Sequence, residues 1–144
     1  MSMAVRNGAG KLEVAGLVGL KYAPEAWCPT MLQAQREGAN CWGLTRLALA
    51  RMDITLPDTP EEAAATQRAT LWRTAKGRPR AGDLWLIEYR NPETKELGQH
   101  FAVVIDGYRA LHTTSGVGSR VQLLAALQRV YTVKERMRHV SVED

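Results

Sequence analysis

Residues 40–47 read NCWGLTRL and place a thiol at the start of an apolar helical stretch. Apolar side chains then recur with the 3.6-residue spacing of an amphipathic helix, at Leu44, Leu47, Ala48 and Met52. The N-terminus of a helix carries partial positive charge, which favours a thiolate over a thiol. Cys41 is therefore a candidate nucleophile, although a cysteine at a helix start is more often a small buried apolar residue.

Two histidines downstream supply candidate partners for this thiol. His100 opens the predicted strand 99–105, and His112 lies in the predicted strand 108–113. A neighbouring imidazole can take the proton of a thiol and hold it as imidazolium. In this arrangement His100 is the base, and His112 bonds the far ring nitrogen of His100 and sets its tautomer.

The turn between these strands decides whether the histidines meet, and two loop lengths are open. A two-residue loop pairs Ile105 with Tyr108 and places the histidines on opposite faces of the sheet. A three-residue loop over 105–107, with Gly107 left-handed, pairs Val104 with Tyr108 and makes the histidines direct cross-strand neighbours. A catalytic role for both histidines predicts the three-residue loop.

Size and composition fit one ordinary globular domain. The chain has 144 residues, 45% of them apolar and 24% charged, which is enough for a core. No apolar run approaches the roughly 18 residues of a membrane span, so no membrane partner is expected. Residues 1–10 lack the pattern of a signal peptide, and we expect the protein to be cytoplasmic as synthesised.

Charge and cysteine usage exclude several classes of partner. The net charge of +4 is spread along the chain and indicates a solvated surface. No basic stripe interleaved with aromatic residues suggests nucleic acid. Cys28 and Cys41 do not have the spacing of a zinc site, and a disulfide between them is not expected in a reducing compartment. We therefore expect no metal and no cofactor.

Local patterns predict helices first and a sheet second. Helices are expected over 11–21, for one turn at 31–36, from Cys41 to about Asp53, over 59–76, and over 120–127, where Ser119 and Gln122 form a capping-box pattern. Strands are expected over 83–90, 99–105, 108–113, 130–133 and 140–142. The class is α+β, with N-terminal helices packed on an antiparallel sheet of about five strands.

These segments resemble the NlpC-type family of papain-like cysteine peptidases, and especially its phage-tail branch. The likeness lies in the order of short motifs: 18–22 (VGLKY), 40–46 (NCWGLTR), 54–57 (ITLP), 79–84 (PRAGDL), 100–104 (HFAVV) and 111–113 (LHT). It covers about residues 12–133 of what we take as one domain, 1–144. The resemblance implies a papain-like fold.

The resemblance also implies a function. Family members cleave amide bonds in bacterial cell-wall stem peptides without a cofactor, and tail-branch members work with other phage-tail proteins or at the cell wall. On this basis Cys41, His100 and His112 form a catalytic triad. Tyr22 and Trp42 are candidate substrate-binding residues, with packing as the alternative for both and the core favoured for Trp42.

Two departures from the family pattern keep other functions open. Asn40 stands where the family has Asp, and residues 23–27 replace a pair of glycines near the expected substrate site. A structural phage-tail or scaffold protein with a degenerate peptidase fold is one alternative. Acyl transfer through a thioester of the same cysteine is another.

Overall fold

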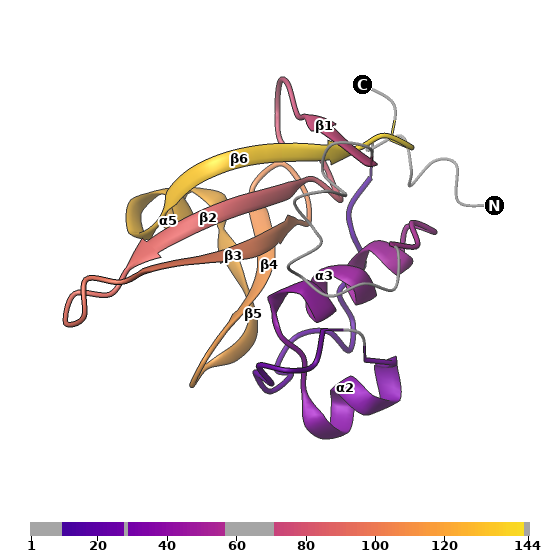
Figure 1. Ribbon diagram of the computed structural model, residues 1–144. Coiled ribbons are helices and arrows are strands. Elements are labelled where there is room, and N and C mark those ends of the chain that lie inside the picture. Colours follow the sequence, from indigo (N-terminus) through magenta and orange to yellow (C-terminus); the bar gives the residue numbers. More distant parts are fainter. Residues whose placement is uncertain (1–9, 28, 57–70, 143–144) are drawn as a thin grey trace.

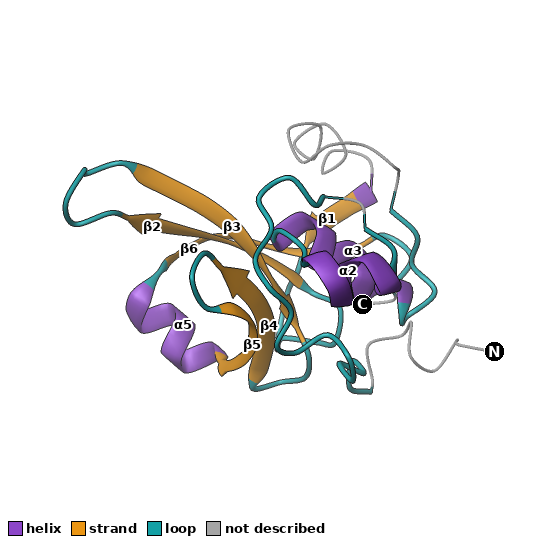
Figure 2. Ribbon diagram, turned by 90° about the horizontal axis from the view of Figure 1, so that it is seen from below, coloured by secondary structure: helices purple, strands orange, loops and turns teal. Residues whose placement is uncertain are grey.

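The structure is a computed structural model that describes residues 10–27, 29–56 and 71–142. Helices α2 (Met31–Glu37) and α3 (Cys41–Ala50) lie on one side of an antiparallel sheet (Figure 1). The sheet has six strands: β1 (Trp72–Thr74), β2 (Leu84–Arg90), β3 (Leu97–Val104), β4 (Arg109–Thr114), β5 (Gly118–Leu123) and β6 (Thr132–His139). Helix α5 (Leu124–Val130) covers the other side (Figure 2). The predicted α+β class is confirmed, with six strands in place of about five.

The sheet opens between β3 and β4. Its order is β1-β6-β2-β3-β4-β5. Strand β2 pairs with β3 along its whole length, and β4 pairs in the same way with β5. Between β3 and β4, in contrast, pairing is confined to Val103 with Leu111 and Val104 with Ala110. Beyond these pairs β4 and β5 diverge from β2 and β3 (Figure 1), and the N-terminal end of α3 lies near the opening.

The two faces of the sheet build two apolar clusters. Phe101, Val103 and Leu111 face α3 and belong to the larger cluster, which also contains Trp42 and Leu44. The alternate residues of the same strands face α5, where a smaller cluster includes Trp85, Ala102, Val104, Ala110 and Leu127. Since side chains alternate along a strand, His100 and His112 share the face of Ala102 and Ala110.

The start of α3 is held against the preceding loop by close backbone contacts. The side chain of Asn40 accepts a hydrogen bond from the N–H of Gly43 at 2.8 Å and donates to the carbonyl of Pro24 at 3.0 Å. At Gly43 a Cβ atom would lie 2.3 Å from the carbonyl oxygen of Ala26, so only glycine fits. Asn40 thus caps the helix in the way an aspartate would.

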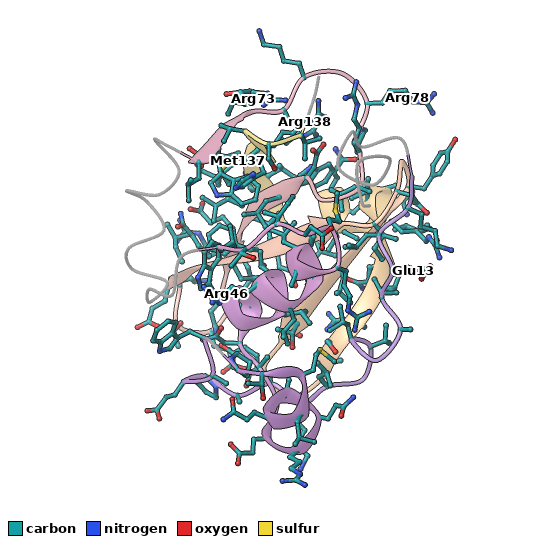
Figure 3. All side chains as sticks on the ribbon, turned by 90° about the vertical axis from the view of Figure 1, so that its right-hand side faces the viewer. Glu13, Arg46, Arg73, Arg78, Met137 and Arg138 are labelled. Atoms are coloured by element: carbon teal, nitrogen blue, oxygen red, sulfur yellow. The ribbon has the colours of Figure 1, made fainter. Side chains whose placement is uncertain are left out.

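A buried ion pair joins the start of β2 to the end of β6. The guanidinium of Arg138 donates to both carboxylate oxygens of Asp83 at 2.8 Å, and the two side chains are 1% and 2% exposed. Arg138 also donates to the carbonyl of Arg78, and both residues lie in the upper part of Figure 3. The sequence interpretation of a spread, solvated charge is therefore wrong for Arg138.

Several predicted elements differ from the structure. Residues 11–21 form turns, with positive φ at Gly16 and Gly19, and not a helix. Of the predicted helix 59–76, residues 59–70 lie outside the described part, and 72–74 form β1. Residues 118–123 form β5, so the helix predicted over 120–127 begins at Leu124.

The capping-box interpretation failed because Ser119 has tertiary partners. Its hydroxyl accepts a hydrogen bond from the N–H of Leu20 at 2.8 Å and donates to the carbonyl of Leu17 at 2.6 Å. These bonds hold Ser119 within β5, and the N-cap of α5 is Leu123. The contact attaches the N-terminal loop to the edge strand β5.

The hairpin turn has the predicted length but a different register. Ile105 donates its N–H to the carbonyl of Arg109 at 2.8 Å, so the three loop residues are 106–108 and not 105–107. Asp106 accepts from the N–H groups of Tyr108 and Arg109, which builds the turn from an aspartate; Gly107 does not have the positive φ that was expected. The register moves by two residues. Both histidines therefore remain on one face, as diagonal and not direct neighbours.

The buried Asp83–Arg138 pair predicts a large loss of stability in Asp83→Asn. This change keeps the size of the side chain but leaves a buried guanidinium without its counter-charge, and it should lower the unfolding free energy by about 3–5 kcal/mol. Urea denaturation followed by circular dichroism measures the change. Glu93→Gln removes the same charge from an exposed turn residue and should have almost no effect. Equal stability of the two variants would contradict the structural role of the pair.

Candidate active site

Cys41 is the first residue of α3 and is 6% exposed. It lines a pocket of about 600 Å³ whose wall comes from both separated strands and from the loop before α3. The lining residues are Tyr22, Cys41, Tyr89, Asn91, Gly98, Gln99, His100, Thr113, Thr114, Ser115 and Tyr131. The opening of the sheet thus brings the helix N-terminus with Cys41 into the same pocket as His100.

The two histidines lie against each other beside this pocket. Their rings are stacked, with centroids 5.6 Å apart and planes within 6°. Nδ1 of His112 lies 3.4 Å from Nε2 of His100. His112 is fully buried, while His100 is half-buried and reaches the pocket wall. Of the two loop lengths that the sequence left open, the structure has the three-residue one, which places both histidines on one face.

Tyr131 fixes the orientation of both imidazole rings. Its ring stands nearly perpendicular to that of His100 at 5.0 Å and to that of His112 at 6.1 Å. Burial raises the pKa of the Tyr131 hydroxyl, which keeps this side chain neutral. Sequence analysis did not single out Tyr131, because it expected a strand over 130–133, where the structure has the junction of α5 and β6.

The environment keeps both imidazoles uncharged near neutral pH. Burial, followed by the charges of His112 and Arg120, lowers the pKa of His100 to about 4. Burial and Arg120 also lower the pKa of His112 to about 4, although the hydrogen bond that His112 donates to Gln122 acts in the opposite direction. A neutral imidazole has a free lone pair, so His100 is able to accept a proton at the pH of a cell.

Gln122 on β5 extends the pair of His100 and His112 to a row of three polar side chains across β3, β4 and β5. Its Oε1 lies 2.5 Å from Nε2 of His112. The sequence interpretation assigned Gln122 to a helix and therefore missed it. Strand-like alternation was available as a signal, because Val121 and Leu123 alternate with the polar residues Arg120 and Gln122 after the glycines at 116 and 118.

Of the two predicted substrate-binding residues, one lines the pocket and one does not. Tyr22 forms part of the wall and pairs with Ala39 in an isolated parallel bridge beside α3. Trp42 is 1% exposed and packs its ring 5.2 Å from that of Phe101. Its burial contradicts a direct contact with substrate and supports the alternative of a core residue.

Thr113 adds a hydroxyl that the sequence analysis did not identify. The residue is 2% exposed, lines the pocket with Cys41, and its Oγ1 has no hydrogen-bond partner in the described part of the chain. A buried hydroxyl without a partner costs free energy, so it is suited to donating to a bound ligand.

The described part of the chain holds no cluster of possible metal ligands. Within residues 10–27, 29–56 and 71–142, no three His, Cys, Asp or Glu side chains are grouped so that they could hold a metal ion. In the same ranges, no helix has the length and apolar character needed to cross a bilayer.

Comparison with known proteins places the chain in a family. The chain resembles a crystal structure of a Staphylococcus aureus protein described as similar to a lipoprotein of the NLP/P60 family, with a TM-score of 0.55 and 17% identity. The match covers 99% of this chain but only 42% of that protein. No curated protein sequence matches the chain, and neither positive match bears on a phage-tail branch. The NlpC/P60 family model matches residues 29–141, and the chain therefore belongs to the NlpC/P60 family.

Proposed function

We propose that this protein is a cysteine hydrolase that cleaves an amide bond in a peptide of the bacterial cell wall, with Cys41, His100 and His112 as its triad. Membership of the NlpC/P60 family points to a cell-wall peptidase or amidase. The single observation that carries the proposal for this chain is the stacked, neutral histidine pair beside a pocket that Cys41 also lines.

The first chemical step is transfer of the thiol proton from Cys41 to His100. Nε2 of His100 faces His112, so Nδ1 is the ring nitrogen left to act as base. The thiolate then attacks the substrate carbonyl carbon, and the carbonyl oxygen becomes an oxyanion. Imidazolium at His100 next protonates the leaving amine, and a thioester to Cys41 remains.

Two kinds of donor near Cys41 are suited to the oxyanion. N–H groups in the first turn of α3 point out of the helix N-terminus, where they have no intrahelical partner. The Thr113 hydroxyl, buried in the same pocket wall, supplies a further donor. Water then attacks the thioester with His100 again as base, which releases the acid product and restores the thiol.

The pocket wall suits a polar peptide that is not strongly charged. Among the described residues, its side chains are three tyrosines, hydroxyl and amide residues, Cys41 and His100, with no Asp, Glu, Lys or Arg. Tyr22 and Tyr89 offer flat apolar surface together with a hydroxyl. The narrower proposal that the protein acts with other proteins of a phage tail rests on sequence resemblance alone; association with purified tails tests it.

Loss of the thiol provides the direct test of the hydrolase. Cys41→Ser should lower the rate of release of new amino groups from purified peptidoglycan by at least about 10³-fold, because a serine hydroxyl beside a neutral imidazole is a far weaker nucleophile. The other cysteine supplies a matched control, since Cys28→Ser should retain activity. Unchanged activity in Cys41→Ser would refute the proposal.

The products of the same reaction distinguish the alternatives. A new free carboxylate indicates hydrolysis, whereas a new amide or ester indicates acyl transfer. A folded wild-type protein that releases neither product would favour the structural-scaffold function.

Burial of the imidazoles also predicts the pH dependence of hydrolysis. Because the pKa of His100 is lowered to about 4, the base stays unprotonated as the pH falls through 6.5 and is lost only near pH 4. The acid side of the kcat/KM profile should therefore lie well below the ordinary histidine value. Initial rates between pH 3.5 and 9 measure it. A midpoint near 6.5 would contradict the buried, neutral base.

A further inference from the structure

The row of polar side chains does not end at His112 but continues to β5. Gln122 lies opposite Ala110 in the β4–β5 register, which makes it the diagonal neighbour of His112 on the same face. Its Oε1 is 2.5 Å from Nε2 of His112, and Nδ1 of His112 is 3.4 Å from Nε2 of His100. One side chain from each of β3, β4 and β5 thus forms a continuous chain of contacts.

The direction of this chain follows from what each atom can do. An amide oxygen only accepts hydrogen bonds, so Nε2 of His112 carries the proton. A neutral His112 then has a lone pair at Nδ1 and accepts from Nε2–H of His100. A neutral His100 in turn has its lone pair at Nδ1, the nitrogen available to Cys41.

Hydrogen bonds running in the opposite direction would leave His100 unable to act as the base. If a donor stood in place of the Gln122 oxygen, His112 would carry its proton on Nδ1 and would require a lone pair on Nε2 of His100. The proton of His100 would then lie on Nδ1, and this nitrogen could not take a proton from Cys41. Since burial keeps both rings neutral, no second proton is present to remove this constraint.

We propose that Gln122 is a positioning residue that sets the tautomers of His112 and His100, and thereby makes Nδ1 of His100 the base for Cys41. The inference rests on the proposed hydrolase function and deepens it. The sequence resemblance assigned three catalytic residues, and Gln122 is a further residue that acts only through the histidines.

Other groups around the histidines do not replace this role. Arg120, opposite His112 on β5, is a cation that donates to Thr114 and to the carbonyl of Gly118. Tyr131 packs its ring across both imidazoles, and Tyr89 packs its ring against that of Tyr131. Among the hydrogen bonds of the described residues, Gln122 supplies the acceptor at Nε2 of His112.

Two substitutions that keep the size of the side chain test whether Gln122 acts as a hydrogen-bond acceptor or only fills space. Gln122→Met keeps the volume and removes the acceptor, and it should lower kcat at least about tenfold, within the ~10⁴-fold that a wrong tautomer costs a catalytic triad. Gln122→Glu offers only acceptor oxygens, so it should retain most of kcat. It should also raise the pKa of His112, because a carboxylate stabilises the imidazolium.

Long-range ¹H–¹⁵N spectra of the imidazoles provide a readout that does not depend on activity. At pH 7 wild type and Gln122→Glu should show the proton of His112 on Nε2, and Gln122→Met should show a shift towards Nδ1. A His112 proton on Nδ1 in wild type, or identical spectra and kcat in wild type and Gln122→Met, would overturn the inference. Failure of the hydrolase proposal gives a different result, namely no Cys41-dependent hydrolysis by wild type.

Discussion

The divergence of β3 and β4 is the constraint on which the candidate site depends. A fully paired hairpin would place its apolar face against α3 and its histidines on the far side of the sheet, away from Cys41. Pairing stops after Val103 and Leu111, however, and the strands separate. The space between them becomes a pocket. It is lined by residues of β3 and β4, by Tyr131 between α5 and β6, and by the start of α3. Groups from opposite faces of the sheet can therefore meet in this pocket.

Close packing on the helix side keeps the thiol in place. Gly43 allows the carbonyl of Ala26 to approach α3, and Asn40 joins the cap of the helix to the same loop. Tyr22, at the start of this loop, is carried into the pocket wall next to Cys41. The loop that holds Cys41 thus also contributes Tyr22 to the pocket wall. The departure from the family pattern at Asn40 leaves this arrangement intact.

Sequence patterns predicted the features that depend on local chemistry and on the alternation of side chains along a strand. The α3 start at Cys41, the strands around His100 and His112, and their common face follow from periodicity and from a three-residue turn. The helix expected over 120–127 is wrong because the Ser119 hydroxyl bonds to Leu17 and Leu20, about a hundred residues earlier in the chain. Gln122 was missed for the same reason, since its place beside His112 exists only when 118–123 is a strand. The burial of Arg138 likewise depends on Asp83, a partner distant in sequence.

The central claim is that Cys41 and His100 act as a pair, and the pH dependence of Cys41 alkylation tests it most directly. Mass spectrometry after iodoacetamide treatment gives the rate at Cys41 in wild type and in His100→Ala. The account predicts faster alkylation at pH 6 in wild type than in His100→Ala, because the neutral imidazole can take the thiol proton as the sulfur attacks. The variant should react appreciably only towards the roughly 8.5 of an ordinary thiol. Identical profiles for the two proteins would contradict the pairing of thiol and imidazole.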